Sequence, residues 1–419
     1  MLLRLPELRK NLFLDAAKQR ELQWKKLKLL LKHSYENVPF YHRKFDRAGI
    51  KPEHIRESED LSKIPLTTRE ELQRLPLETV TARNIDIEQC EKTTTSGTTG
   101  TPLTLILDRR TVEYGNGMWI RALERDGLKN RDKMAVIRHP EYFPKEHWFQ
   151  RMGIRSRKNI SALDNAERQI MMLEEYCPQA IKGYSSSLWE IARTLEHRSH
   201  NIKPRLAFSG GELMSPQARE SITSSFDTEL FDNYGATEFS LIAWECRGHV
   251  GYHINTDSVL TEFLDSRGEY VGEGERGAVV CTGLHNHAMP LIRYKGDDIA
   301  VPMNFHCPCG VKLPLLRGIE GRQSDLLITL DGRSISPWRF FPYPFDDYTG
   351  IIQFKITQER KDRIVFQLVL EDTFDMSRLD EARKRIKNLF GEKMQIDFQI
   401  IEKFDREKSG KARTISRLF

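Results

Sequence analysis

The sequence lacks any long apolar segment. No run approaches the ~18 consecutive apolar residues of a membrane-spanning helix, so no membrane span is expected. The first residues, Met1 to Pro6, are interrupted by Arg4 and Pro6 and lack the apolar core of a secretory signal peptide. We therefore expect a cytoplasmic protein.

Cysteine is scarce, and neither sign of charge dominates. The 6 cysteines in 419 residues do not predict a disulfide scaffold. The 65 basic and 60 acidic residues leave a net charge of +5 without clustering, which argues against a nucleic-acid partner. There is also no internal repeat or low-complexity tract. A hydrophobic content of 39% and a charged content of 30% are instead typical of a globular enzyme with two or three domains.

Strand-like and helical patterns alternate through the middle of the chain. Strands are expected over residues 103–107, 134–137, 180–184, 206–209 and 230–234, and helices over residues 111–126, 165–176, 186–197 and from Ser215 onward. This order is typical of an α/β fold with a partly parallel sheet. Such sheets bind ligands outside the carboxyl ends of their strands.

The N-terminal part is expected to be helical. Residues 21–47 have helical periodicity that Pro39 interrupts, which predicts two helices or a kink. Residues 66–75 predict a further helix, with a capping-box spacing from Thr67 to Glu70.

The end of the chain follows another pattern. Strands are expected over residues 351–356, 364–370 and 394–401, with a helical apolar stripe between the second and the third. This order predicts a small α+β unit of its own. We therefore expect two domains, residues 1–321 and residues 322–419.

One uncharged stretch, Thr93 to Pro102, is rich in threonine, serine and glycine. Its backbone N–H groups and hydroxyls are suited to surround an anion, since glycine permits a tight path and the short side chains supply donors. No lysine stands where the phosphate loop of NTPases needs one, and a strand follows rather than a helix. The stretch therefore predicts a phosphate-binding loop of another kind; the alternative is a polar linker. Its central residues are Ser96, Gly97, Thr98, Thr99, Gly100 and Thr101.

This loop resembles the phosphate loop of the adenylate-forming superfamily of acyl-CoA synthetases and adenylation domains. Leu103 stands where many members have lysine, which is closest to the phenylacetate-CoA ligase-like branch. The resemblance implies a large N-terminal domain with mixed sheets and flanking helices, followed by a small mobile α+β domain. It also implies that the loop holds the β- and γ-phosphates of ATP.

A second motif runs from Asn233 to Glu238, at the end of a predicted strand. Tyrosine can stack on a base, threonine can bond a phosphate, and glutamate can hold Mg²⁺. The segment Asn233-Tyr234-Gly235-Ala236-Thr237-Glu238 is similar to the superfamily motif in which Thr contacts phosphate and Glu binds Mg²⁺. The resemblance implies that Thr237 contacts phosphate and that Glu238 binds Mg²⁺. Gly211 and Glu212, in a Gly-Gly-Glu segment, likewise resemble the lining of the adenine pocket.

Two further segments match the family with substitutions. Residues 291–300 resemble the segment whose aspartate holds both ribose hydroxyls, and the alignment assigns this role to Asp298, with Asp297 as the alternative. Residues 321–325 resemble the hinge motif, in which Arg322 would contact a phosphate. Ser324 stands where the family has the hinge aspartate.

Near the end of the chain, residues 406–413 resemble the basic Ser-Gly-Lys loop of the superfamily. There the lysine, Lys411 in this chain, bridges the carboxylate and the α-phosphate. An ordinary basic tail is the alternative reading. The order of the motifs along the chain favours the catalytic role.

The cysteines suggest a metal site. Cys246, Cys307 and Cys309, with one histidine, make a complete tetrahedral donor set for structural Zn²⁺. His249 and His253 are both candidates for the fourth ligand, and the resemblance favours His253. Reduced cysteines in a turn are the alternative.

The resemblance implies a two-step enzyme. A carboxylic acid, by family default an aryl or arylacetic acid, would react with Mg²⁺·ATP to acyl-AMP, and coenzyme A would then accept the acyl group. An amine acceptor, an enzyme that stops at the adenylate, and a non-catalytic nucleotide-binding protein remain alternatives. A homodimer is compatible with this reading.

Overall fold

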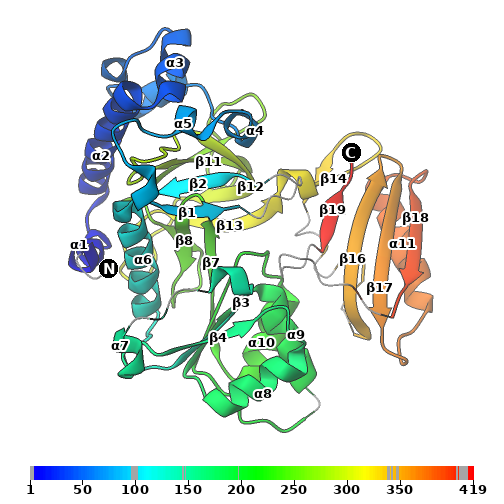
Figure 1. The fold of residues 1–419 in the computed structure, drawn as a ribbon. Coiled ribbons are helices and arrows are strands. Elements are labelled where there is room, and N and C mark those ends of the chain that lie inside the picture. The colour runs from blue at the N-terminus through cyan, green and yellow to red at the C-terminus, as the bar shows by residue number, and fades with distance from the viewer. Residues whose placement is uncertain are drawn as a thin grey trace. The chain divides into compact units, whose positions relative to one another are not determined.

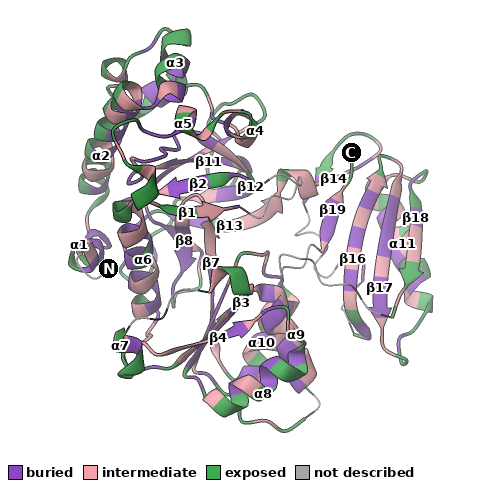
Figure 2. Cartoon of the chain, in the orientation of Figure 1, coloured by how far each residue is buried: buried purple, intermediate pink, exposed green. Residues whose placement is uncertain are grey.

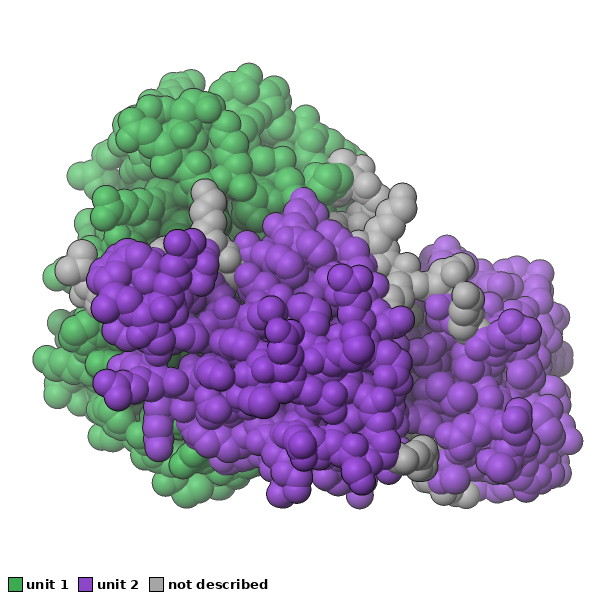
Figure 3. All heavy atoms as spheres, turned by 60° about the horizontal axis from the view of Figure 1, so that its bottom comes forward, with its two compact units in different colours: residues 1–127, 233–319 green, residues 128–232, 320–419 purple. Residues whose placement is uncertain are grey.

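The computed structural model describes most of the chain, with the following coverage: residues 4–95, 102–143, 146, 148–196, 198–336, 340, 343–345, 349–402, 404 and 414–419. The predicted loop residues Ser96–Thr101 and the predicted catalytic Lys411 lie outside the described residues. The chain divides into two compact units, coloured separately in Figure 3. Unit 1 contains residues 1–127 and 233–319, and unit 2 contains residues 128–232 and 320–419.

Unit 1 begins with helices. The longest is α2, which starts after the N-cap Asp15 and ends before Pro39, where α3 begins. The predicted break at Pro39 is therefore confirmed, because proline is accepted only in the first turn of the new helix. The helices of this part are α1 (Leu5–Asn11), α2 (Ala16–Asn37), α3 (Pro39–Arg47), α4 (Arg69–Gln73), α5 (Leu77–Val80) and, after two strands, α6 (Arg109–Arg125), with short turns η2 (Pro52–His54), η3 (Ser58–Lys63) and η4 (Ile87–Gln89).

The capping box of α4 is one residue later than predicted. Thr68, not Thr67, is the N-cap, and it exchanges hydrogen bonds with Glu71. Thr67 is fully buried because its backbone pairs with the strand that contains Tyr294. The strand contact, which the local spacing does not encode, shifts the start of the helix.

The strands of unit 1 form an antiparallel sheet and a separate two-stranded ribbon. The ribbon pairs β1 (Glu91–Thr94) with β2 (Thr104–Leu107), the strand expected after the threonine-rich stretch. The sheet has the order β10-β11-β12-β13-β9-β8, followed by β7. Its strands are β7 (Glu229–Ala236), β8 (Ser240–Glu245), β9 (Tyr252–Ile254), β10 (Val259–Leu264), β11 (Gly277–Gly283), β12 (Tyr294–Met303) and β13 (Leu315–Arg322); residues 229–232 of β7 and 320–322 of β13 are counted with unit 2.

The first half of unit 2 is the predicted alternation of strands and helices. Its parallel strands have the order β6-β5-β3-β4, and α8, α9 and α10 supply the other half of the core (Figures 1 and 2). The strands are β3 (Met134–Arg138), β4 (Arg157–Ser161), β5 (Ala180–Gly183) and β6 (Leu206–Gly210). The helices are η5 (Pro140–Tyr142), α7 (Trp148–Arg151), α8 (Ala166–Tyr176), α9 (Ser185–Leu195) and α10 (Pro216–Phe226).

The second half of unit 2 has a sheet and an apolar core of its own. Sheet order is β18-β17-β16-β19, and Ile356, Phe366 and Ile386 are among its buried residues. The predicted order strand, strand, helix, strand is present; β19 is an additional strand that was not predicted. The elements are η6 (Gln323–Asp325), β14 (Leu327–Ile328), β15 (Ser334–Ile335), β16 (Ile351–Arg360), β17 (Arg363–Leu370), α11 (Ser377–Phe390), β18 (Gln395–Ile400) and β19 (Ile415–Arg417).

The fold class is the predicted α/β class, with a large sheet and a smaller C-terminal α+β part. None of the described helices is both long and apolar enough to cross a bilayer.

Candidate active site

The second predicted motif forms a tight turn at the end of β7. At Gly235 the register between β7 and β8 shifts, and a Cβ atom there would lie 2.3 Å from the carbonyl oxygen of Ser240. Only glycine is compatible with this approach. The turn leaves Tyr234 and Glu238 half-buried and Thr237 exposed. Asn233, immediately before them, is buried and lies opposite Trp244 of β8.

Tyr234 contacts the predicted ribose-binding residue. Its hydroxyl donates a hydrogen bond of 2.8 Å to Oδ2 of Asp298, in β12. Burial, followed by the charge of Asp298, raises the pKa of Tyr234, so the phenol stays protonated and remains a donor. Asp297, the alternative ribose ligand, is exposed, whereas Asp298 is half-buried. The structure therefore places Asp298, rather than its neighbour, against the motif at the end of β7.

Glu238 lies in the same part of unit 1. The hydroxyl of Tyr294 is 3.3 Å from its Oε1 and can donate to it. Burial raises the pKa of Glu238, and nearby Asp298 raises it further, whereas Arg69 and Tyr294 lower it. Two carboxylates, Glu238 and Asp298, thus share one site with an arginine. This is a setting in which a divalent cation would relieve the repulsion.

Arg69 connects this site to the threonine-rich segment. It is the first residue of α4, and its Nη2 donates a 2.6 Å hydrogen bond to the hydroxyl of Thr95. Thr95 also exchanges hydrogen bonds with Leu103: its N–H donates to the carbonyl of Leu103, and its hydroxyl accepts from the Leu103 N–H. The two ends of the predicted phosphate loop are therefore tied together next to the arginine that acts on Glu238.

The remaining predicted nucleotide residues belong to unit 2. Gly211 follows β6 with φ +82, a conformation that favours glycine. The carboxylate of Glu212 accepts a 2.8 Å hydrogen bond from the backbone N–H of Ser186, in the first turn of α9. Arg322 is the last residue of β13, directly before the turn η6.

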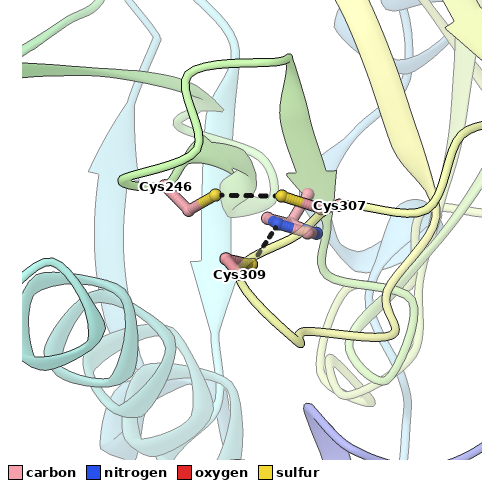
Figure 4. A group of neighbouring side chains, drawn as sticks. Cys246, Cys307 and Cys309 are labelled. Atoms are coloured by element: carbon pink, nitrogen blue, oxygen red, sulfur yellow. Dashed lines mark hydrogen bonds between the residues drawn. The ribbon is translucent and has the colours of Figure 1, made fainter.

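A second cluster in unit 1 has the composition of a metal site. The ligand atoms of Cys246, His253, Cys307 and Cys309 all lie within 4.8 Å of one another. Cys246 Sγ is 3.4 Å from Cys307 Sγ, and Cys309 Sγ is 3.3 Å from Nε2 of His253 (Figure 4). Zn–S bonds of about 2.3 Å in a tetrahedron imply donor separations of about 3.8 Å, so small shifts would admit the ion.

The surroundings of the cluster suit Zn²⁺. Nδ1 of His253 is 3.3 Å from the carbonyl oxygen of Leu313, a contact that orients Nε2 toward the sulfur atoms. Burial lowers the pKa of His253 to about 4, so the ring is neutral and can coordinate at neutral pH. Gly248 lies against the cluster, where a Cβ atom would be 3.0 Å from Cys307 Sγ.

His249, the alternative ligand, is directed elsewhere. Its Nδ1 lies 3.0 Å from the carboxylate of Glu245, and it is not in the group of four. The other cysteines, Cys90, Cys177 and Cys281, are also not part of the group. The geometry therefore selects the Cys₃His set with His253.

Comparison with known proteins gives consistent relatives. Residues 327–417 match the CapK C-terminal domain family. The chain is 28% identical over 332 residues to a phenylacetate-coenzyme A ligase of Thermus thermophilus, covering 75% of this chain and 73% of the relative. It is also 28% identical over 325 residues to the phenylacetate-coenzyme A ligase of Escherichia coli, covering 73% and 72%. The chain is thus similar to the phenylacetate-CoA ligase-like branch of the adenylate-forming superfamily.

Solved structures support the same fold. A 2-hydroxyisobutyryl-CoA ligase in complex with 2-HIB-AMP, in the postadenylation state, aligns with this chain at a TM-score of 0.80. The alignment has 19% sequence identity and covers 98% of this chain and 91% of the ligase. The complex of that ligase with 2-HIB-AMP and CoA, in the thioesterification state, aligns at a TM-score of 0.66 with 21% identity, covering 97% and 91%.

Several of the predicted residues are thus brought together, whereas Ser96–Thr101 and Lys411 lie outside the described residues. Asp298, Tyr234 and Glu238 share one site within unit 1, and the four zinc candidates share another. Sequence reasoning missed Arg69 and the hydroxyl of Tyr294. Tyr294 could have been found, because it lies beside Arg293 in a recognised motif. Arg69 could not, because its only sequence signal is its position at the start of a predicted helix. Arg293 itself is buried in an ion pair with Glu262, with a shortest distance of 2.9 Å.

Proposed function

We propose that the protein is an AMP-forming carboxylate–CoA ligase. It activates a carboxylic acid with ATP to acyl-AMP and pyrophosphate, and transfers the acyl group to coenzyme A. One observation carries the proposal: Asp298 and Glu238 lie together, with Arg69 and the tied ends of the threonine-rich segment beside them. The names of the curated relatives support the choice of CoA as acceptor.

The residues of unit 1 would bind the nucleotide. Asp298, held by the Tyr234 hydroxyl, would accept hydrogen bonds from the ribose hydroxyls, since a carboxylate accepts from both members of a vicinal diol. Glu238 would hold Mg²⁺, which binds proteins through one or two carboxylates together with phosphate oxygens. The phosphates would be contacted by Ser96–Thr101, Thr237 and Arg322. These roles rest on the family resemblance.

The reaction would proceed in two displacements. An oxygen of the substrate carboxylate attacks the α-phosphorus, the bond between that phosphorus and the bridging oxygen breaks, and pyrophosphate leaves. The thiol of CoA then loses its proton to solvent as its sulfur attacks the acyl carbonyl carbon, and AMP leaves with the electron pair of the broken C–O bond. Negative charge accumulates on the phosphate in the first step, so fixed cations lower the barrier most there.

The C-terminal residues 322–419 would act as a small lid domain. Lys411 would enter the site for adenylation, and the domain would then reorient for thioester formation. Replacement of Lys411 by Ala is expected to abolish most adenylation while transfer from preformed acyl-AMP to CoA continues. Equal loss of both steps would contradict this assignment.

We also propose that Cys246, His253, Cys307 and Cys309 hold a structural Zn²⁺. The set is closed, because four protein ligands fill a tetrahedron, and it supplies no open position for catalysis. The ion would connect the β8–β9 region with the loop before β13.

Acid-dependent exchange between ATP and pyrophosphate tests the proposal across a panel of acids. We expect exchange with at least one acid, and mass spectrometry should detect the acyl-CoA when CoA is added. Absence of exchange with every acid, in folded protein that binds ATP, would favour a non-catalytic nucleotide-binding protein. If exchange occurs, an added amine yields an amide and CoA yields no thioester, then the acceptor is an amine rather than CoA.

A further inference from the structure

Three large apolar side chains are exposed in and directly after α7 of unit 2 (Figure 2). Trp148 is 73% exposed, Met152 68% and Ile154 42%. The N–H of Ile154 donates a 3.1 Å hydrogen bond to the carbonyl of Phe149, which closes residues 148–154 into a turn. This apolar turn therefore presents large apolar side chains to solvent. Apolar side chains gathered in this way on a surface are typical of a binding site.

The apolar turn lies at the amino ends of the parallel strands β3 and β4. Arg157, the first residue of β4, follows it closely, and the N–H of Met134, the first residue of β3, donates a 2.9 Å hydrogen bond to the carbonyl of Ser156. A Cβ atom at Gly153 would have no atom of a described residue within 4 Å, so the turn projects outward. Parallel sheets bind their substrates outside the carboxyl ends of the strands. The apolar turn is therefore at the opposite end of these strands and needs another explanation.

Basic side chains accompany the apolar turn. Residues 148–161 contain no acidic residue and the following basic ones: Arg151, Arg155, Arg157 and Lys158. A second basic segment lies against them, because Nε of Arg155 donates a 2.9 Å hydrogen bond to Oδ1 of Asn130. Lys129 and Arg131, on either side of Asn130, are exposed. The surface thus combines exposed apolar side chains with positive charge.

Two acidic side chains lie near these cations and do not outweigh them. Asp132 is buried and forms an ion pair with Arg205. Glu146 is 3.4 Å from Arg151 in an exposed ion pair, and its charge also acts on Arg157. Exposed ion pairs of this kind are weak and exchange readily for other partners. An anionic partner would therefore still be attracted to the surface.

We propose that this surface binds a membrane with anionic headgroups. Tryptophan prefers the membrane–water interface, the apolar side chains of Met152 and Ile154 would enter the boundary with the acyl chains, and Lys and Arg attract anionic headgroups. The chain would lie on the membrane without crossing it. A second copy of the chain is a poorer partner, because a twofold contact would place this basic surface against itself. The inference goes beyond the proposed function and does not depend on it.

Cosedimentation of the full chain with vesicles tests the proposal. Vesicles of phosphatidylcholine alone are compared with vesicles that also contain phosphatidylglycerol, at low and at high salt. We expect binding to the anionic vesicles to be about tenfold or more tighter than to the neutral ones, and weaker at high salt, because salt screens the attraction. Equal binding to both kinds of vesicle, or no binding to either, would overturn the proposal.

Matched variants locate the binding surface. Met152→Ser and Lys129→Gln should each weaken binding to the anionic vesicles severalfold, and the double variant about tenfold or more. Met376→Ser and Lys384→Gln make the same changes at exposed residues of the C-terminal part and should have no effect. Unchanged binding in the double variant, shown to be folded by circular dichroism, would place the contact elsewhere and overturn the proposal.

Trp148 gives a direct signal of insertion. Lipids with brominated acyl chains quench the fluorescence of tryptophans that reach them, and we expect such quenching when the wild-type chain binds anionic vesicles. Trp148→Phe keeps an apolar ring, so it should bind nearly as tightly but lose most of the quenching. Full quenching in the bound variant would show that another part of the chain enters the membrane, which would contradict the proposal.

Two other partners are outcomes of the same series. If vesicles do not bind and analytical ultracentrifugation shows self-association that Met152→Ser abolishes, the surface joins two copies of the chain and the proposal fails. If vesicles do not bind and polyglutamate binds in a manner that Lys129→Gln weakens, the partner is an acidic protein and the proposal also fails.

Discussion

The hydroxyl of Tyr234 donates a 2.8 Å hydrogen bond to Oδ2 of Asp298, a residue 64 positions further along the chain. The bond joins two separate motifs, one at the end of β7 and one within β12. It also holds in place a carboxylate whose negative charge contributes to raising the pKa of Glu238. Under the proposed function, Asp298 held in this way would bind the ribose.

Asp298→Asn should raise the KM for ATP about tenfold or more. A hydrogen bond to a charged group contributes about 1.5–3 kcal/mol, and an amide accepts through only one of its two terminal atoms. Asp297→Asn is the matched control, because it makes the same change at the exposed neighbour. Steady-state exchange kinetics measure both variants; a larger effect at Asp297 would contradict the assignment.

The pH dependence of activity should report Glu238. Burial raises the pKa of this carboxyl above 4.5, so it is still partly protonated at a pH where an ordinary glutamate is ionised. Because Mg²⁺ needs the ionised form, kcat/KM for Mg·ATP should fall with decreasing pH at a higher pH than an ordinary glutamate would give. Glu238→Gln should lower kcat/KM about 100-fold or more and remove this acid limb. An unchanged limb in the variant would show that another group controls it.

Arg69→Gln should affect both the phosphates and Glu238. The variant loses the 2.6 Å hydrogen bond to Thr95, so we expect a severalfold higher KM for pyrophosphate in exchange. It also removes a positive charge that lowers the pKa of Glu238, so the acid limb should move to still higher pH. Arg74→Gln, at the exposed end of the same helix, should change neither quantity. If the role of Arg69 were purely structural, the variant would have lower activity but the acid limb of its pH profile would not move.

Much of the fold was predictable because it follows from local patterns. The break at Pro39, the alternating strands and helices and the C-terminal strand, strand, helix, strand order all rest on periodicity and on residues with restricted dihedral angles. Thr68 shows the limit: the cap of α4 moved by one residue because Thr67 pairs with a distant strand. Such contacts depend on the whole fold.

The candidate site was predictable to the extent that its residues lie in recognisable motifs. Asp298 and Glu238 were proposed from such motifs, and the cysteine cluster from the number and type of its side chains. Arg69 was not, because an arginine at the start of a short helix has no distinguishing sequence pattern.

The metal site predicts one equivalent of zinc per chain. Cys307→Ser should reduce the zinc content severalfold or more, as measured by elemental analysis after purification without added metal, and should lower Tm by several degrees because the ion stabilises only the folded state. Cys177→Ser is the control: this cysteine is exposed and lies outside the group of four. Wild-type protein without zinc, and with a Tm unaffected by exhaustive chelation, would contradict the proposal.

The largest predicted loss of stability concerns a buried ion pair in unit 1. Arg121 of α6 is fully buried, 2.7 Å from Oδ2 of Asp257, and it also donates to Asn255 and to the carbonyl of Leu8. Burial alone would raise the pKa of Asp257, but the charge and hydrogen bonds of Arg121, with Asn11 and Lys26, lower it to about 2. The ion pair therefore stabilises the folded state at pH values above the ordinary pKa of aspartate. This stabilisation is lost as the pH falls toward 2.

Arg121→Met should lower the free energy of unfolding by about 3–5 kcal/mol, because it leaves a buried carboxylate without its partner. Arg109→Met in the same helix is the matched control: it removes an ion pair with Glu113 in which the arginine side chain is 87% exposed, and should cost less than about 1 kcal/mol. Adding Asp257→Asn to Arg121→Met should recover part of the loss, since the buried carboxylate is then replaced by a neutral amide. Urea unfolding at pH 7 measures the series. A double variant less stable than Arg121→Met alone would mean that Asp257 is stabilised by its other partners, Asn11 and Lys26, rather than by the arginine.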